Sequence, residues 1–249
     1  MGDVYIPESA MAIMAHPDDI EFSCAGTTAR WASAGARISY VLCTNGDVGI
    51  AEPGMTHEKA GEIREGEARE AARIAGVKEI VFLNERDCML ENTMALRRKL
   101  VREIRRFRPE VIICGDPTML WGGDGDYINH PDHRAAGWAA VDAAFPAAGQ
   151  PNLFEELEAE GLKASKVRKV FVVAWSEGSY FVNIDATIET KIAALKAHKS
   201  QVAELDADKL LREWAGGTAK GKEMQYAESF RVVTLENDAF WEKYKKENG

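Results

Sequence analysis

The chain has 249 residues, of which 46% are hydrophobic, which suits one large α/β domain or two small ones with a substantial core. Its formal net charge of -9 argues against nucleic acid as a partner, because an acidic surface repels phosphate. The sequence has no run of about 18 apolar residues, so no membrane span is expected.

Apolar runs alternate with helical patterns along the chain. Strands are predicted at residues 11–15, 38–43, 80–83, 111–115, 170–175, 180–184 and 230–234. Helices are predicted at 28–33, 60–74, 93–107, 134–145 and 185–198, with Thr93 and Asp185 as possible caps. Residues 146–166 are interpreted as a possible surface excursion, and the basic run from Arg97 to Arg106 as solvated helix surface.

Most of the predicted strands are apolar at nearly every position, which is typical of strands buried on both faces. Their alternation with helices predicts an α/β fold: a Rossmann-like, doubly wound, mostly parallel sheet with helices on both faces. No convincing linker or internal repeat divides the chain, so residues 1–249 are expected to form a single domain.

Two similar motifs stand at the ends of predicted strands. Residues 16–19 read His-Pro-Asp-Asp and follow the first strand, and residues 130–133 read His-Pro-Asp-His and lie beyond the fourth. Ligands gather beyond the carboxyl ends of such strands, so one fold can bring both motifs together. Imidazole nitrogen and carboxylate oxygen are ligands that zinc accepts, and the pair of motifs therefore indicates a metal-dependent hydrolytic site.

The simplest ligand set is His16, Asp19 and His133, because a catalytic zinc keeps three protein ligands and one position for water. Taken alone, either motif would be an ordinary capped turn. An N/O site of this kind also accepts other divalent metals, such as iron or cobalt.

The remaining motif residues supply acid and base groups. Asp18 could take the proton of the attacking water, and His130 could donate to a developing oxyanion or a leaving amine. Asp132 has two interpretations: a favourable charge at the start of a helix, or a carboxylate that orients His130.

With both motifs in view, the chain resembles the LmbE-like, or PIG-L, superfamily. The first motif lies within residues 15–21, Ala-His-Pro-Asp-Asp-Ile-Glu, followed by Gly26-Thr27, and residues 130–133 match the second family motif. Weaker similarity runs through residues 44–49, 64–67, 86–87, 198–201 and 228–231, and so spans nearly the whole chain.

The resemblance implies a zinc-dependent de-N-acetylase that releases acetate from an N-acetylglucosamine-type sugar or its conjugate. It implies one zinc per chain on His16, Asp19 and His133, with Asp18 as general base and His130 as oxyanion or acid partner. Assembly into trimers or hexamers is also expected from it.

The resemblance further implies sugar contacts from Asp47, Arg64 and Asp87. Residue chemistry leaves alternatives open, since Arg64 could lie on a solvated helix face and Asp87 could start a turn. His198 could bond the carbonyls of a helix end, or His198 or Gln201 could border the site. The glycine-rich segment 121–127 could shape a sugar pocket or serve as a connection.

Two rival functions remain at this stage. One is cleavage of a larger amide, such as a thiol conjugate, and the other is a non-catalytic metal- or sugar-binding module. A dinucleotide-binding enzyme is disfavoured, because no Gly-x-Gly-x-x-Gly follows the first strand. The N-terminus lacks signal-peptide features and the four cysteines form no Cys-x-x-Cys pair, so a cytoplasmic location is expected.

Overall fold

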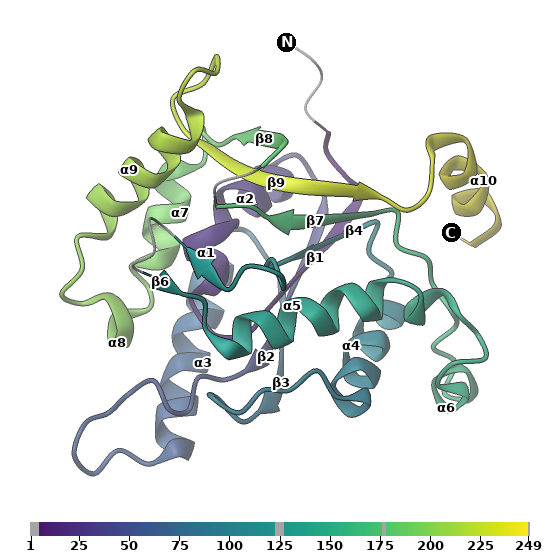
Figure 1. Cartoon of the computed structure of the whole chain (residues 1–249), viewed down its shortest axis with the longest axis horizontal. Coiled ribbons are helices and arrows are strands. Elements are labelled where there is room, and N and C mark those ends of the chain that lie inside the picture. Colours follow the sequence, from purple (N-terminus) through teal and green to yellow (C-terminus); the bar gives the residue numbers. More distant parts are fainter. Residues whose placement is uncertain (1–4, 123–126, 176–177, 249) are drawn as a thin grey trace.

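The structure is a computed structural model that describes residues 5–122, 127–175 and 178–248. A seven-stranded sheet in the order β3-β2-β1-β4-β7-β9-β8 crosses the molecule (Figure 1). The strands are β1 (Ser9–Met14), β2 (Arg37–Thr44), β3 (Glu79–Glu85), β4 (Val111–Cys114), β7 (Lys169–Val173), β8 (Tyr180–Asn183) and β9 (Ala227–Thr234). Six of the seven strands run in one direction, and β9 runs antiparallel to its neighbours β7 and β8. The predicted doubly wound, mostly parallel sheet is confirmed.

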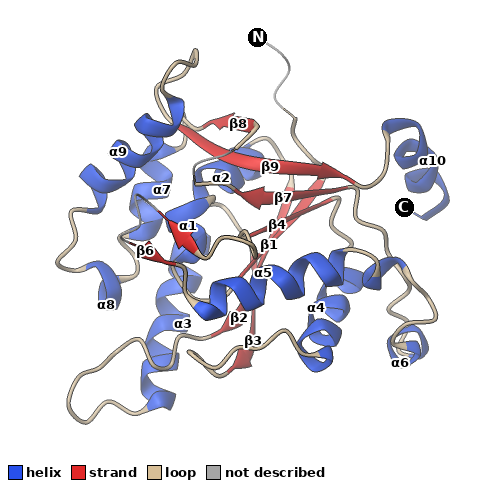
Figure 2. Cartoon of the chain, in the orientation of Figure 1, coloured by secondary structure: helices blue, strands red, loops and turns tan. Residues whose placement is uncertain are grey.

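Helices cover both faces of this sheet (Figure 2). One face carries α2 (Ala25–Ser33), α3 (His57–Ile74), α7 (Ile188–Leu195) and α9 (Ala207–Ala219). The other carries α4 (Met94–Phe107), α5 (Pro131–Ala144), the 3-10 turn η1 (Ala147–Gly149) and α6 (Glu155–Ala159). The short helices α1 (Asp19–Ser23) and α8 (Lys199–Val202), the C-terminal α10 (Asp238–Asn248) and the two-stranded pair β5 (Trp121–Gly122) and β6 (Tyr127–Ile128) complete the described elements. Each face of the sheet thus has its own hydrophobic core.

The strand order reverses direction at β1, which pairs with β2 on one side and β4 on the other. Ile13 near the end of β1 stands in register with both Val41 of β2 and Cys114 of β4. At such a switch point the loops leaving neighbouring strands diverge to opposite faces and open a crevice. The loops after β1 and β4 carry the two histidine motifs.

Two local predictions need correction. Asp185 does not cap the following helix: α7 begins after Thr187, and Asp185 instead accepts the backbone N–H groups of Gln225 and Tyr226. The basic run from Arg97 to Arg106 is not solvated throughout, because Arg105 is 2% exposed and donates to the carbonyls of Gln150 and Leu153 in the surface segment 146–166, where Leu157 of α6 is buried. A basic residue from the predicted solvated run therefore holds this segment in place.

Thr93 caps α4 as predicted, since its hydroxyl accepts the N–H of Leu96 at 3.1 Å. Within the described residues, no helix has both the length and the apolar character needed to cross a bilayer.

Candidate metal centre

Asp19 shapes the turn that follows β1. Its Oδ2 accepts the backbone N–H of His16 at 2.8 Å and that of Ala15 at 3.1 Å. This leaves Oδ1, which lies 3.1 Å from Nε2 of His133 on α5. The turn also places Asp18 at a φ of 96°, a left-handed conformation that Asp and Asn tolerate better than most residues. One carboxylate thus builds the loop and faces the second motif.

His133 is oriented by a residue that the sequence analysis did not single out. Its Nδ1 lies 3.0 Å from Oδ1 of Asn129, whose own amide donates to the carbonyl of Met119. Since the Asn129 oxygen can only accept, Nδ1 of His133 carries the proton. Nε2 of His133 therefore faces Asp19, to which it donates when the imidazole is protonated and toward which it offers a lone pair when the imidazole is neutral. The only local signal was an amide immediately before the second motif.

His16 is oriented from the opposite side by two carboxylates. Its Nε2 lies 3.1 Å from Oδ1 of Asp87 and 3.2 Å from Oδ2 of Asp132, while Nδ1 faces Asp19 at 3.6 Å. Both carboxylates are acceptors, so Nε2 carries a proton and Nδ1 is the nitrogen that can bind a metal. The ring centres of His16 and His133 are 5.2 Å apart.

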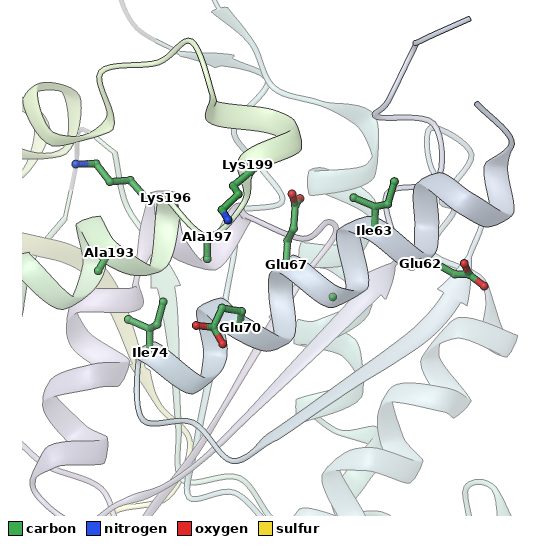
Figure 3. Close-up of a pocket in the computed structure, with 10 residues that line it drawn as sticks. Glu62, Ile63, Glu67, Glu70, Ile74, Ala193, Lys196, Ala197 and Lys199 are labelled. Atoms are coloured by element: carbon green, nitrogen blue, oxygen red, sulfur yellow. The ribbon is translucent and has the colours of Figure 1, made fainter. Parts of the chain in front are cut away.

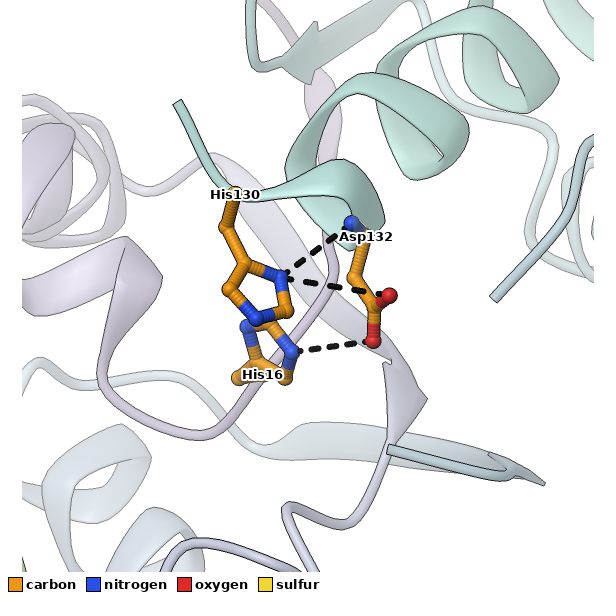
Figure 4. A group of neighbouring side chains, drawn as sticks. All are labelled: His16, His130 and Asp132. Carbon is orange, nitrogen blue, oxygen red and sulfur yellow. Dashed lines mark hydrogen bonds and ion pairs between the residues drawn. The ribbon is translucent and has the colours of Figure 1, made fainter. Parts of the chain in front are cut away.

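Asp132 has closer partners than the predicted one. His130 Nδ1 is 3.9 Å from Asp132 Oδ1 and instead accepts the backbone N–H of Asp132 at 3.2 Å, which makes His130 the cap of α5 (Figure 4). The Asp132 carboxylate accepts the backbone N–H groups of Cys88 and Leu90 at 2.8 and 3.2 Å. Asp132 therefore ties the loop after β3 to His16, whereas a backbone group orients His130.

Arg64, which is buried, pairs with the partly exposed Asp18 beside the cluster. Arg64 is 4% exposed, and its Nη2 donates to the carbonyl of Pro17 at 2.6 Å and to Oδ2 of Asp18 at 3.2 Å. Its Nη1 donates to the carbonyl of Gly46, and a Cβ on Gly49 would lie 2.3 Å from Nη1. The guanidinium thus fills space left by glycine and supports the loop that carries Asp18.

The three predicted sugar contacts all have protein partners. Besides Arg64, Asp87 is 5% exposed and accepts the N–H of Val48 at 3.2 Å while facing His16. Asp47 accepts the N–H of Asp87 at 3.2 Å, and its other oxygen lies 3.2 Å from Nδ1 of His57. These contacts place Asp87 and Arg64 behind the cluster, and direct sugar contact by the three residues stays a prediction.

Burial and mutual charge shift the pKa values of the acidic side chains. Burial and the neighbouring charge of Asp19 raise the pKa of Asp18 to about 7, against the lowering effect of Arg64. Burial alone would raise the pKa of Asp19, but the charge and hydrogen bond of His133 hold it well below its usual range. Two adjacent carboxylates therefore differ, one poised to exchange a proton near neutral pH and one held ionised.

The histidines respond to the same carboxylates. Burial lowers the pKa of His16, but its bonds to Asp132, Asp19 and Asp87 outweigh this effect and raise it to about 12. Burial and the charge of His16 lower the pKa of His130, whose side chain is 35% exposed. The carboxylates around His16 thus favour a positive charge there, while His130 favours its neutral form.

The donor set fits a divalent cation. His16, Asp19 and His133 each offer a ligand atom, and these atoms lie within 4.8 Å of one another. Outer hydrogen bonds hold both imidazoles with their inner nitrogens facing one another, and a metal that displaced the inner protons would find the arrangement of a carboxylate–histidine–metal site. The surplus of carboxylates around His16 would be balanced by a cation as well as by a proton. His16, His130 and Asp132 also group closely, but Asp132 already accepts two backbone N–H groups.

Two buried ion pairs anchor the helices beside the metal ligands. Glu21, two residues after Asp19, lies 3.2 Å from Nε2 of His198, which is fully buried and makes no contact with helix-end carbonyls through this nitrogen. Gln201, next to it on α8, donates to the carbonyl of Gly49 at 3.1 Å. These contacts draw α8 against α1 and the loop after β2.

The second anchor comes from β9. Glu228 accepts the backbone N–H groups of Gly26 and Thr27 at 2.9 and 2.7 Å and pairs with Lys191 of α7. Both charged side chains are 4% exposed. The Glu228 carboxylate thereby accepts the N–H groups at the start of α2, which have no partner within the helix. It also connects the junction of α1 and α2 to β9.

One hollow on the surface lies away from this cluster. It has a volume of about 540 Å³ and runs along α3, α7 and the start of α8 (Figure 3). Its walls bear charges of both signs, including Glu67, Glu70, Lys196 and Lys199, and none of the clustered histidines. Glu67 is already bonded to the N–H and hydroxyl of Ser200. This hollow is therefore separate from the candidate metal site.

The glycine-rich segment predicted at 121–127 is described only at its ends. Trp121 and Gly122 pair with Tyr127 and Ile128 as β5 and β6, and residues 123–126 lie outside the described residues.

Comparison with known proteins agrees with the fold and the cluster. The family model for GlcNAc-PI de-N-acetylase, PIG-L, matches residues 11–144, which include both histidine motifs. The diacetylchitobiose deacetylase of Thermococcus kodakarensis is 31% identical over 230 residues, covering 91% of this chain and 83% of the relative. A probable N-acetyl-alpha-D-glucosaminyl L-malate deacetylase 2 of Bacillus anthracis is 28% identical over 240 residues, covering 93% of each chain.

Among solved structures, the N,N'-diacetylchitobiose deacetylase of Pyrococcus horikoshii superposes with a TM-score of 0.83 at 27% identity, covering 92% of this chain and 84% of that one. The fold and the paired motifs define an α/β deacetylase scaffold. The chain belongs to the PIG-L family of de-N-acetylases.

Proposed function

We propose that this protein is a zinc-dependent hydrolase that removes the N-acetyl group from an N-acetylglucosamine-type sugar or its conjugate and releases acetate. One observation carries the proposal: the ligand atoms of His16, Asp19 and His133 converge, next to a mostly buried carboxylate with a pKa of about 7. A metal-dependent deacetylase uses this combination of a cation site and a base that works at neutral pH.

His16, Asp19 and His133 would hold one zinc per chain. When bound, the metal supplies a Lewis acid that polarises the acetamide carbonyl and lowers the pKa of a water. Asp18 takes a proton from the attacking water, whose oxygen forms the new bond to the carbonyl carbon. Asp18 or His130 then delivers a proton to the nitrogen as the C–N bond breaks, which leaves acetate and a free amine.

The remaining residues support these steps. Arg64 holds the Asp18 carboxylate, and opposes the rise of its pKa that burial causes. His130, at the exposed rim of the cluster, is placed to donate to the developing oxyanion through the nitrogen that the backbone of Asp132 does not use. Asp132 and Asp87 keep the imidazole of His16 in one tautomer.

The names of the relatives support a small N-acetylated sugar conjugate as substrate. We extend the proposal to a homo-oligomer and to a cytoplasmic location, which suits the four cysteines with no disulfide. Light scattering would establish the assembly.

The decisive experiment is acetate detection over a panel of N-acetylglucosamine, N,N'-diacetylchitobiose and N-acetylglucosaminyl conjugates, with metal analysis of the purified protein. Turnover that a chelator abolishes and zinc restores is expected. Restoration by another divalent metal alone would correct the metal, and release of a bulky acyl group instead of acetate would correct the reaction.

A further inference from the structure

The short helix α8 is held to α3 through polar groups. Of its residues Lys199–Val202, Val202 is the buried one. Glu67 of α3 accepts the backbone N–H of Ser200 at 2.8 Å and its hydroxyl at 2.6 Å, and Figure 3 shows the Glu67 side chain rising from α3 toward α8. A helix of four residues gains little stability from its own backbone bonds, so bonds of this kind keep it in place.

Gln201 of α8 holds the turn that follows β2. Its Nε2 donates to the carbonyl of Gly49 at 3.1 Å and to the hydroxyl oxygen of Ser200 at 3.1 Å. The N–H of Gly49 donates in turn to the carbonyl of Gly46 at 3.0 Å, which closes the turn. Residues 51–54, which come soon after, are exposed. Gln201 therefore anchors the turn just before the chain enters an exposed segment.

The same turn lies against Arg64. The carbonyl of Gly46 accepts Nη1 of Arg64 at 3.2 Å, and a Cβ on Gly46 or Gly49 would lie 2.2 or 2.3 Å from that nitrogen. The backbone of the turn thus forms a wall against the guanidinium. On its other side, Nη2 of Arg64 donates to Oδ2 of Asp18 at 3.2 Å. A shift of the turn would therefore free the guanidinium and loosen its bond to Asp18.

These contacts form a closed circuit. Arg64 and Glu67 lie one turn apart on α3, so this helix holds the turn after β2 through Arg64 and α8 through Glu67. Gln201 connects α8 back to the turn. His198, immediately before α8, lies 3.2 Å from Glu21 of α1, two residues beyond Asp19. Helix α8 is thereby fixed to elements on two sides of the Asp18 loop.

The amide of Gln201 is fully used in these contacts. Its two protons point to Gly49 and Ser200, and the Ser200 hydroxyl gives its own proton to Glu67. Gln201 thus has no further donor for a substrate while the circuit is intact. Its chemistry suits an action through the turn and not through contact with a sugar.

We infer that Gln201 is a positioning residue for the reaction at the metal centre: it holds the turn Gly46–Gly49 on Arg64, and Arg64 thereby keeps Asp18 in place to accept the proton of the attacking water. This inference rests on the proposed function. Removing the Gln201 bond should lower kcat but leave KM and metal content nearly unchanged, because neither the substrate nor the metal is held through it.

The test is acetate release by metal-loaded Gln201→Met, which keeps the length of the side chain and removes the donor. We expect kcat to fall about three- to tenfold, the range for one lost hydrogen bond, with KM and metal content within about twofold of the wild type. Gln201→Lys, which restores a donor of similar reach, should recover most of the rate. Gln225→Met is the matched control, because the Gln225 amide donates to the hydroxyl of Tyr226 at the surface.

A double variant shows whether the effect passes through Arg64. In an Arg64→Lys background, Gln201→Met should cost less than about twofold, because the guanidinium that the turn holds is already gone. Amide hydrogen exchange over residues 45–56 should be faster in Gln201→Met than in the wild type, and unchanged in Gln225→Met. The exchange measurement decides the question even if Arg64→Lys does not fold. Equal losses of kcat in both backgrounds, a loss expressed in KM, or unchanged exchange would each overturn the inference.

Exchange also separates this inference from the proposed function. If the wild-type protein releases no acetate from any sugar, the proposed function is wrong, but faster exchange in Gln201→Met at residues 45–56 and also at 17–20 would still support the positioning contacts. Unchanged exchange in an inactive protein would overturn both.

Discussion

Oδ2 of Asp132 lies 3.2 Å from Nε2 of His16, and the same oxygen accepts the backbone N–H of Cys88 at 2.8 Å. The first turn of α5 thus fixes both the side chain that leaves β1 and the loop that leaves β3. Three segments far apart in the sequence meet on one carboxylate. The geometry of the metal cluster therefore depends on a residue that need not touch metal or substrate.

Replacing this carboxylate should weaken metal binding. Asp132→Asn keeps the shape but removes the charge, and outer partners of metal-bound histidines typically contribute about 10- to 100-fold in affinity or activity. Metal content after competition with a graded chelator measures the effect. Asp142→Asn, an exchange on the outer part of the same helix, is the control, and equal metal retention by both variants would contradict the role given to Asp132.

Asp18→Asn should abolish most turnover while the protein keeps its metal. A general base contributes about 10²- to 10⁴-fold to the rate, and asparagine cannot take the proton. Asparagine is preferable to alanine here, because Asp18 has a φ of 96° and asparagine accepts that conformation. Acetate release and metal content are measured on the same sample. An unchanged rate would rule out Asp18 as the base.

Arg64→Met should destabilise the fold. The guanidinium bonds two carbonyls and Asp18 while 4% exposed, and breaking a buried pair from one side typically costs about 3–5 kcal/mol. Urea unfolding gives the free energy of unfolding. Arg73→Met, at a side chain that is 72% exposed on the same helix, should stay within about 0.5 kcal/mol of the wild type.

Gly49→Ala tests the same packing from the opposite wall. The added Cβ would lie 2.3 Å from Nη1 of Arg64, so the guanidinium must move and the Asp18 carboxylate loses its partner. We expect turnover to fall with little loss of metal, because the atoms nearest the added Cβ belong to Arg64 and Gly46 and not to a metal ligand. Gly54→Ala is not a suitable control, since Gly54 has a φ of +84°, whereas Gly66→Ala meets open space on a helix.

Stability should depend on pH through His198. Burial lowers the pKa of His198, but its hydrogen bond and attraction to Glu21 outweigh burial and raise it above 6.5. A raised folded-state pKa gives stabilisation that is complete below the unfolded value and lost as pH rises through the folded value. The stability difference between the wild type and His198→Gln should therefore shrink as the pH rises above the unfolded value of about 6.5.

The control for this pH test is His57→Gln, since the side chain of His57 is 61% exposed. This exchange removes an exposed imidazole and leaves the buried His198–Glu21 contact in place, so it serves as the reference for the comparison. A His198→Gln difference that is constant over the same range, or that grows with pH, would show that the His198–Glu21 contact does not titrate as the geometry implies.

The sheet and the cluster were predictable because their signals are local. Apolar runs such as residues 111–115 mark buried strands, and proline in each histidine motif marks the start of a turn or helix. Parallel strand ends then converge by topology alone. The proximity of His16 to His133 follows from these two facts.

Other features depended on contacts that no local pattern encodes. Arg105 has the sequence surroundings of a surface residue, yet it is buried because the carbonyls of residues 147–153 converge on it. Asp185 does not cap α7, because its carboxylate accepts two backbone N–H groups from the segment before β9. The partners of Arg105 and Asp185 are therefore determined by tertiary contacts between segments that are distant in sequence.

Glu228 is synthesised long after the segment that it anchors. The N–H groups of Gly26 and Thr27, beside the metal-binding turn, find their acceptor about two hundred residues later, on a strand added between β7 and β8. A chain synthesised only to the end of α5 contains His16, Asp19 and His133 but not Glu228, which anchors the start of α2. The enzyme should therefore mature late in synthesis, and lesions in β9 should impair metal retention although they lie far away in sequence.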